Sequence, residues 1–359
     1  MKVIHIVSSS LEKRLPGQDV RLFDDDVHTR IGKKLLRKTQ RYEMECWRPE
    51  RTLREIYTRQ KDGLTHKLFP SFYVPLPKIK RYEISVPLLR ELRKECQRDK
   101  VLIHLYGFAP SVNLIAHLFR DVPIVAQDLG GMPGLFRLRY IPVKMAFKHI
   151  DYFFTGSTAG HRHTLAALVG EGKLILQMAG VDFDIFHPID KAEAREKLGL
   201  PLDKKIMLYV GRYYELKGVD RILETFEILK QKYAIELLLI GGTDKDPFYV
   251  EAKKARSRIL GFVPNEELPL YYSAADLFLM LNFGSPKGLA SGGIGWASLE
   301  SLACGTPVVG PHLMHFEGSA EELQGVGKIP QTPDDVLPCV AEVLQNPTRY
   351  HHCSQITRR

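Results

Sequence analysis

The sequence has little that would mark a membrane, secreted or zinc-binding protein. It contains no run of roughly 18 apolar residues that could span a membrane, and its opening apolar segment, Lys2–Val7, is too short for a secretory signal. Its five cysteines are odd in number, scattered and never spaced Cys-x-x-Cys. This spacing argues against a structural zinc site and for a reducing compartment. We therefore expect a cytoplasmic protein that holds no metal and begins with a strand at Lys2–Val7.

The sequence also lacks a signature of nucleic-acid binding, although it is basic. A net charge of +9 favours anionic partners such as phosphate-bearing ligands or acidic lipid surfaces. Between Lys33 and Arg41, basic and apolar residues are interleaved at helical spacing. This pattern fits a solvated helix face, and it also fits a helix lying as a peripheral contact on the inner face of the membrane. No aromatic-rich strand motif or zinc finger accompanies the charge, so we expect no nucleic-acid partner.

Short apolar strands alternate with amphipathic helices along most of the chain. Such alternation predicts parallel sheets covered by helices on both faces, which places the protein in the α/β class. Residues 48–83 are harder to interpret, and we expect one strand there, His66–Val74, ended by Pro75. The clearest strands are expected at Val101–Tyr106, Pro123–Gln127, Ile206–Val210 and Ile235–Ile240, and the clearest helices at Val86–Gln97 and Gly218–Lys230.

The alternation relaxes between residues 181 and 200 and then starts again. This break predicts two doubly wound domains joined by a hinge. The expected parts are a first domain at 1–182, a hinge at 183–203, a second domain at 204–345 and a polar tail at 346–359. Packing of the tail back onto the first domain stays open.

Three features of the second domain follow the expected carboxyl ends of its strands, where ligands bind in such sheets. Arg212 follows the first strand and Lys217 precedes the next helix, Gly241-Gly242 forms a tight turn, and a glycine-rich stretch begins at Gly292 and precedes Glu300. Arginine grips a phosphate at two points, lysine adds a point charge, and helix-start amides donate to phosphate oxygens. The alternative is glycine for packing, with Glu300 in a surface salt bridge. The three together predict a nucleoside diphosphate site.

The same segments resemble the family-4 glycosyltransferases of the GT-B fold. The resemblance rests on Val210-Gly211-Arg212 with Lys217-Gly218, on Gly261–Leu268 with Tyr272, and on Leu299–Val309. Weaker similarity, at Asp151–Ser157 and Gly180–Asp182, extends it to roughly residues 100–345. It implies two Rossmann-like domains facing each other across a cleft. It also implies retaining, metal-independent transfer of a sugar from a nucleoside diphosphate sugar to an acceptor hydroxyl, with no further cofactor.

The resemblance also implies roles for single residues. Arg212 and Lys217 match the cations that neutralise the departing diphosphate, and Glu300 matches the carboxylate that holds the ribose hydroxyls. Backbone readout of the base is expected around Val263. The amides that line the phosphate correspond to Gly293, Ile294, Gly295 and Trp296.

Three positions depart from the family pattern. Gly292 stands where the family has a glutamate that touches the donor sugar, and Leu129 stands where it has a histidine. Asp128, beside Leu129, is our candidate for a catalytic polar contact in the first domain. Ser8-Ser9-Ser10 replaces the glycine pair after the first strand, and His104 is a core histidine or a residue of the cleft.

These departures keep two functions open. The first is a glycosyltransferase that acts on a glycan or lipid-linked acceptor. The alternative is a non-catalytic protein of GT-B shape that binds a nucleotide sugar or a lipid, and a nucleotide-sugar epimerase is a third option. The sequence does not identify the donor nucleotide, its sugar or the acceptor.

Overall fold

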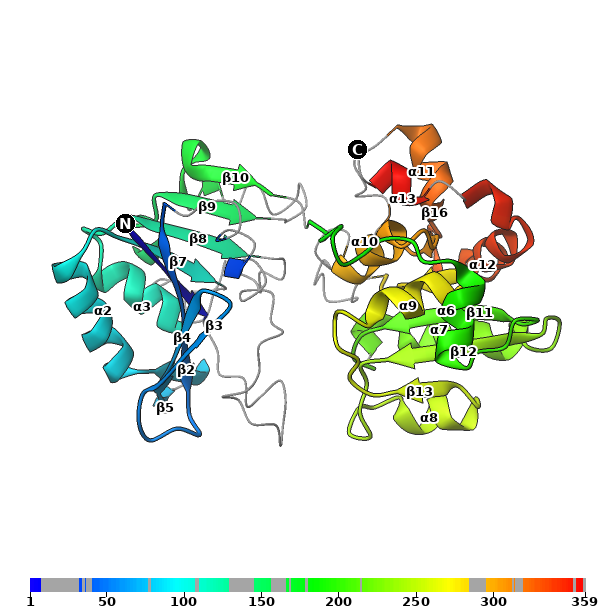
Figure 1. The fold of residues 1–359 in the computed structure, drawn as a ribbon, viewed down its shortest axis with the longest axis horizontal. Helices are drawn as coiled ribbons and strands as arrows, with labels where there is room; N and C mark the ends of the chain where they lie inside the picture. The colour runs from blue at the N-terminus through cyan, green and yellow to red at the C-terminus, as the bar shows by residue number, and fades with distance from the viewer. Residues whose placement is uncertain are drawn as a thin grey trace. The chain divides into compact units, whose positions relative to one another are not determined.

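The chain folds into two compact α/β units, Met1–Met178 and Ala179–Arg359, in a computed structural model (Figure 1). The predicted hinge, 183–203, lies within the second unit. The structure describes residues 1–7, 32–33, 36, 41–76, 79–106, 110–128, 145–155, 166–167, 169–177, 180–213, 215–283, 295–311, 313, 319–350 and 353–357.

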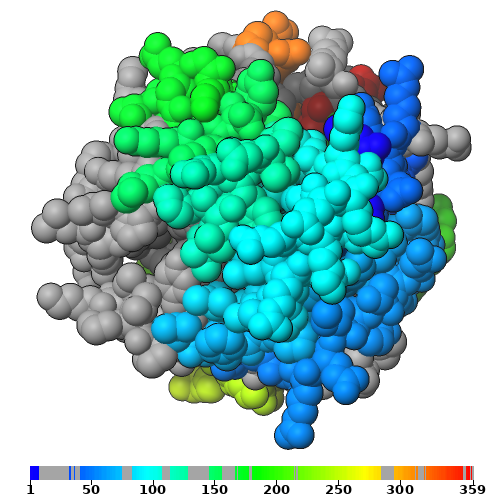
Figure 2. Space-filling view, turned by 90° about the vertical axis from the view of Figure 1, so that its left-hand side faces the viewer, coloured from blue at the N-terminus to red at the C-terminus, as the bar shows by residue number. Residues whose placement is uncertain are grey.

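The first unit is built on an eight-stranded sheet whose order reverses between β2 and β7, on either side of β1. All its neighbouring strands are parallel except the β3–β4 pair. Helix α2 (Val86–Arg98) faces the viewer in cyan in Figure 2, and α3 (Pro110–Leu118) and the short turn η3 (Glu171–Lys173) follow it along the chain. Across the sheet the strands are β10 (Leu174–Leu176), β9 (Tyr152–Thr155), β8 (Ile124–Asp128), β7 (Val101–Tyr106), β1 (Lys2–Val7), β2 (Glu43–Glu50), β4 (Leu64–Pro70) and β3 (Tyr57–Lys61).

The prediction of a single strand at His66–Val74 is wrong. Strand β4 ends at Pro70, and a separate hairpin of β5 (Phe72–Leu76) and β6 (Ile79–Ile84) follows. Pro75 does not end β5, which continues to Leu76, and the pairing with β6 shifts register between Val74 and Leu76, an irregularity at which proline is tolerated. The missed β3–β4 hairpin turns at Asp62-Gly63, with φ of 52° and 79°. Asp-Gly is the residue pair that such a two-residue turn favours, so this signal was present in the sequence.

A cluster of buried and partly buried charges joins three strands of the first unit to helix α2. Lys2 on β1 lies 3.1 Å from Glu45 on β2 and 2.7 Å from Glu95 on α2, and Lys67 on β4 lies 3.1 Å from Glu45. The buried Trp47 indole donates to Glu45 at 2.6 Å. Burial raises the pKa of Glu45, but the bonds from Trp47, Lys67 and Lys2 outweigh it and hold the pKa below its ordinary value. The pairing explains how carboxylates are kept inside this unit.

The second unit contains a six-stranded, wholly parallel sheet whose order reverses between β12 and β14, on either side of β11. Its strands are β13 (Arg258–Leu260), β12 (Ile235–Ile240), β11 (Lys205–Val210), β14 (Leu277–Leu279), β15 (Val308–Val309) and β16 (Gly327–Lys328). Its described helices are α6 (Lys191–Leu198), η4 (Glu215–Lys217), α7 (Val219–Leu229), α8 (Tyr249–Lys254), α9 (Leu268–Ala274), α10 (Trp296–Ala303), α11 (Ala320–Val326), η6 (Pro333–Asp335), α12 (Val336–Gln345), η7 (Pro347–Tyr350) and α13 (Cys353–Thr357). The prediction of doubly wound parallel sheets is confirmed in both units.

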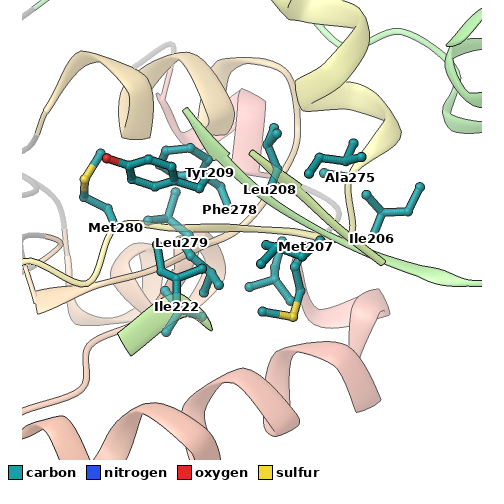
Figure 3. Close-up of a cluster of buried hydrophobic side chains, with 14 of the residues drawn as sticks. Ile206, Met207, Leu208, Tyr209, Ile222, Ala275, Phe278, Leu279 and Met280 are labelled. Atoms are coloured by element: carbon teal, nitrogen blue, oxygen red, sulfur yellow. The ribbon is translucent and has the colours of Figure 1, made fainter. Parts of the chain in front are cut away.

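The central strands of this sheet are apolar along their length because both of their faces are covered. Met207 and Leu208, successive residues of β11, point to opposite faces, and Ile222 of α7 covers the face of Met207 (Figure 3). Each fully buried side chain of this size contributes about 1.5–3 kcal/mol to folding. This burial makes the sheet a rigid base for the loops at its edges.

Helix α6, within the predicted hinge, is bound to the sheet by a carboxylate. Asp276, just before β14, accepts from Arg195 at 2.7 Å, from Lys191 at 3.0 Å and from the amide of Ile206 at 2.7 Å. Burial raises the pKa of Asp276, but Lys191, this amide and Arg195 outweigh it and hold the pKa below its ordinary value. The helix itself is set by its ends, since Asp190 caps its first amides and Gly199 closes it with φ of 60°.

The end of the chain differs from the polar tail expected at 346–359. Tyr350 and Cys353 are 2% and 0% exposed and belong to the core of the second unit, where α13 packs against α10 and α11. Burial raises the pKa of the Cys353 thiol to about 12. Tyr350 ends η7 and Cys353 begins α13, and two isolated apolar side chains were too few to detect as a pattern in the sequence.

Candidate functional site

The connection between β11 and α7 lies at the carboxyl edge of the second sheet, where the strand order reverses. It turns at Gly211, with φ of 152°, and enters α7 through Gly218, with φ of 70°. A Cβ atom at Gly218 would lie 2.1 Å from the carbonyl oxygen of Leu281, just beyond β14. The start of α7 therefore rests on the end of the neighbouring strand, at the position where ligands bind in open α/β sheets.

Two tyrosines hold this connection in place. The Tyr209 hydroxyl donates to the carbonyl oxygen of Arg212 at 2.8 Å, and the Tyr213 ring lies so close to Gly242 that a Cβ there would be 2.2 Å from it. Burial raises the pKa of Tyr213, so its hydroxyl stays neutral. Both predicted cations lie on this braced segment: the Arg212 side chain is exposed and that of Lys217 is partly buried. Cations carried on a braced backbone suit a diphosphate.

Glu300 lies on α10, whose amino end forms the next part of this edge. Its side chain accepts a hydrogen bond from the Tyr272 hydroxyl at 2.9 Å, and Thr306 in turn bonds the Tyr272 carbonyl at 2.6 Å. Glu300 is 9% exposed, so the alternative of a surface salt bridge is wrong. A carboxylate oriented in this way can accept hydrogen bonds from the hydroxyls of a sugar.

The phosphate-lining residues are described only in part. Gly295 precedes α10 as its N-cap, with φ of −71° and ψ of 153°, and offers no side chain to the amides of the first turn. Trp296 begins the helix. Helix-start amides of this kind bind phosphate readily. The predicted Gly293 and Ile294, and the divergent Gly292, lie outside the described residues.

The remaining predicted residues are placed elsewhere. Val263 is partly buried in the loop after β13, beside the exposed Phe262. Asp128 ends β8 in the first unit, where only its backbone is described, and Leu129 lies outside the described residues. His104 pairs with the buried His5 of β1, their ring nitrogens 3.3 Å apart, which agrees with a core histidine.

Sequence reasoning missed the tyrosines that position these groups. Tyr272 was part of the resemblance, but its bond to Glu300 was not foreseen, and Tyr209 and Tyr213 were not singled out. Tyrosines at the end of an apolar strand were the signal, because a buried hydroxyl needs a nearby partner.

Two further expectations concern metal binding and contact with a membrane. Within the described ranges, no group of three or more histidine, cysteine, aspartate or glutamate side chains could hold a metal. Among the residues that the structure covers, no helix combines the length and apolarity of a membrane span. Most of Lys33–Arg41 lies outside the described residues, and Lys33 forms an ion pair with Asp62 at 2.7 Å.

Curated relatives match half of the chain or less. The D-inositol 3-phosphate glycosyltransferase of Segniliparus rotundus is 30% identical over 181 residues, which is 47% of this chain and 39% of that protein. The one from Mycolicibacterium paratuberculosis is 35% identical over 139 residues, 36% of this chain and 29% of that protein. The matched stretches thus span well under half the length of these relatives.

Solved structures match almost the whole chain at low identity. Sucrose-phosphate synthase from Thermosynechococcus elongatus has a TM-score of 0.72 and 20% identity, covering 100% of this chain and 93% of its own. HepE of Anabaena, solved with UDP-glucose, has a TM-score of 0.65 and 14% identity, covering 99% and 93%. The lipopolysaccharide glycosyltransferase WaaG has a TM-score of 0.62 and 14% identity, covering 99% and 94%. These likenesses, with the two doubly wound sheets, identify the GT-B fold.

The family model for glycosyl transferases group 1 matches residues 190–359. This match includes every described group at the carboxyl edge of the second sheet. The similarity to the glycosyl transferases group 1 family therefore covers just under half of the chain, residues 190–359.

Proposed function

We propose that the protein is a glycosyltransferase that moves a sugar from a nucleoside diphosphate sugar to an acceptor hydroxyl with retention of configuration. The observation that carries this proposal is the carboxyl edge of the second sheet. There, the braced connection with Arg212 and Lys217 lies beside β14, and Glu300 is held by Tyr272. Cations on the β11–α7 connection and a buried carboxylate on helix α10 match the two ends of one nucleotide, its diphosphate and its ribose.

In the proposed reaction, the bond from the anomeric carbon to the phosphate oxygen breaks. The acceptor oxygen forms its bond to that carbon on the same face, and its proton passes to the departing phosphate oxygen. Negative charge on the diphosphate grows as this happens, so Arg212 and Lys217 stabilise the transition state more than the bound donor. The amides from Gly293 to Trp296 hold the phosphates, and the backbone around Val263 contacts the base. Asp128 remains the candidate polar contact from the first unit.

A uridine nucleotide is the first donor to test, because HepE was solved with UDP-glucose. The acceptor class is open between a glycan and a lipid-linked sugar. The relatives named for D-inositol 3-phosphate add a phosphorylated polyol to that set. We also propose that the enzyme works in the cytoplasm without a metal or another cofactor, and that Lys33–Arg41 makes any contact with acidic lipid.

A donor screen followed by a transfer assay tests the proposal. UDP-, GDP-, ADP- and TDP-sugars are first compared for the rise in melting temperature that ligand binding produces. The donor that stabilises the protein is then offered with the three acceptor classes. We expect turnover in the wild type, a fall in kcat of about a hundredfold or more in Lys217→Ala, and little change in the control Lys254→Ala on α8. Donor binding without transfer to any acceptor would favour the non-catalytic alternative, and an inverted sugar nucleotide as product would reveal an epimerase.

A further inference from the structure

The opposite, amino-terminal edge of the second sheet contains a hollow that the proposed donor site does not use. Its volume is about 490 Å3, within the range of small-molecule pockets. It is formed where α7 and α8 end and where β11, β12 and β13 begin. The floor is apolar, with Phe226, Ile235 and Ala255, and the wall carries four cations and one carboxylate, Lys204, Lys230, Arg256, Arg258 and Glu236.

Three of the four cations are held by neighbouring groups. Lys204 pairs with Glu236 at 2.8 Å, and Lys230 pairs with Glu227 on its own helix. Arg258 donates to the carbonyls of Leu198 and Gly199, at the end of α6, at 3.3 and 3.2 Å. Carbonyl oxygens carry no net charge, so Arg258 is oriented without being neutralised. The hollow therefore keeps an excess of positive charge.

Arg256 is the cation whose conformation stands out. It follows the last residues of α8 with φ of 58°, a left-handed conformation that glycine usually occupies at the end of a helix. Its side chain is exposed and has no hydrogen bond or ion pair with any part of the chain that the structure describes. An arginine in this conformation costs about 1–2 kcal/mol relative to glycine. Strained residues without a structural partner often mark a binding site.

We propose that this hollow binds a small phosphate-bearing molecule, with Arg256 and Arg258 gripping the phosphate and the apolar floor accepting the organic part. Planar guanidinium groups make paired hydrogen bonds to phosphate oxygens, and the lysines add charge around them. The hollow is separate from the proposed donor site, because it lies at the other end of the same strands. A ligand there would contact the ends of α7 and α8.

Inorganic pyrophosphate is the probe for this site, titrated calorimetrically into protein saturated with UDP so that the proposed donor site is occupied. We expect one pyrophosphate per chain, with affinity about tenfold weaker in Arg256→Gly. This substitution removes the guanidinium and suits the left-handed backbone, so the protein should still fold. Lys254→Ala, which removes one charge from the same helix outside the hollow, should change the affinity less than twofold. The titration is repeated without UDP to separate the two sites. If UDP does not bind, the proposed donor site is contradicted, while the pyrophosphate titration still tests the hollow.

The phosphate could belong to a soluble metabolite or to a lipid headgroup. Co-sedimentation with phosphatidylglycerol vesicles, compared with phosphatidylcholine vesicles, distinguishes them. Loss of pyrophosphate binding in Arg256→Gly supports a soluble ligand, and loss of vesicle binding alone supports a headgroup. The proposal is overturned if neither probe binds, or if Arg256→Gly and Lys254→Ala behave alike in both experiments.

Discussion

The two edges of the second sheet use polar residues in opposite ways. At the amino edge, Asp276 is paired on three sides, by Arg195, Lys191 and the amide of Ile206, and fixes α6 to the strands. At the carboxyl edge, glycines shape the backbone and tyrosine hydroxyls position Arg212 and Glu300. One edge therefore uses charge to hold the fold, and at the other, hydrogen bonds from tyrosines hold the backbone of Arg212 and the carboxylate of Glu300.

The two edges suggest a criterion for telling structural charges from ligand-binding charges within one domain, namely how the charged atoms are paired. A charged group whose oxygens or nitrogens all meet protein partners contributes to stability, and its loss leaves those partners buried and unpaired. At the carboxyl edge, the tyrosine hydrogen bonds reach the backbone of Arg212 and one carboxylate oxygen of the buried Glu300. Arg256 complicates the contrast, because it is an outward-directed charge at the amino edge.

The largest expected effect is on the paired carboxylate. Asp276→Asn should lower the free energy of unfolding by about 3 kcal/mol or more, because it leaves the buried Arg195 without a counter-charge. Urea denaturation monitored by circular dichroism measures this change. Lys191→Met is the matched control, since Lys191 is half-exposed and its ion pair should contribute less than about 1 kcal/mol.

The Asp276 carboxylate should also make the free energy of unfolding depend on pH. The pKa of Asp276 is lower in the folded protein than its ordinary value, so its contribution is complete above that ordinary value and is lost as the pH falls through the folded pKa. The stability difference between the wild type and Asp276→Asn should therefore shrink below about pH 4. A constant difference between pH 7 and pH 3 would mean that Asp276 does not act through its charge.

At the carboxyl edge, Gly218→Ala should cost more than about 2 kcal/mol. The added Cβ needs a left-handed backbone and would meet the Leu281 carbonyl oxygen at 2.1 Å. The loss should appear in both the unfolding free energy and the affinity for UDP. Gly172→Ala, at a glycine where a Cβ meets nothing within 4 Å, should leave both unchanged. Equal effects at the two positions would remove the argument that α7 rests on β14.

A smaller effect is expected from the tyrosine that orients Glu300. Tyr272→Phe removes one buried hydrogen bond, which is worth about 1 kcal/mol, and should raise the KM for the donor several-fold. If Glu300 binds the ribose, a donor analogue lacking a ribose hydroxyl should lose little additional affinity in this variant. An additive loss would place the ribose elsewhere.

The smallest effect on stability is expected at Arg256, on the amino edge of the second sheet. Arg256→Gly should leave the free energy of unfolding within about 1 kcal/mol of the wild type, because relief of the left-handed strain offsets the greater freedom of the unfolded chain. Lys254→Gly, in the right-handed last turn of the same helix, should lose about 1 kcal/mol. Thermal unfolding of the two variants measures this difference. An equal loss of stability in both would contradict the prediction.

Much of the second unit could be predicted from the sequence, and part of the first could not. Strand β12, helix α7 and helix α2 fall where apolar periodicity placed them, because long, strongly patterned segments have one way to bury their apolar faces. The region from Tyr57 to Ile84 has short, mixed strands, where periodicity is weak. There, the Asp62-Gly63 turn was the better guide.

The candidate site shows the same limit. Arg212, Lys217 and Glu300 could be named because they follow strand ends or lie in a motif. The burial of Glu300 by Tyr272, 28 residues away in the chain, could not be named.

The sequence by itself determined that the chain forms two parallel sheets with helices on both faces, since its short apolar runs can be buried in no simpler way. The tertiary structure decided which polar groups meet. Arg195 and Asp276 lie 81 residues apart and share one carboxylate–guanidinium pair, and the strand order brings the β11–α7 connection onto the end of β14. Such contacts depend on how strands are ordered in space, and local residue patterns contain no record of that order.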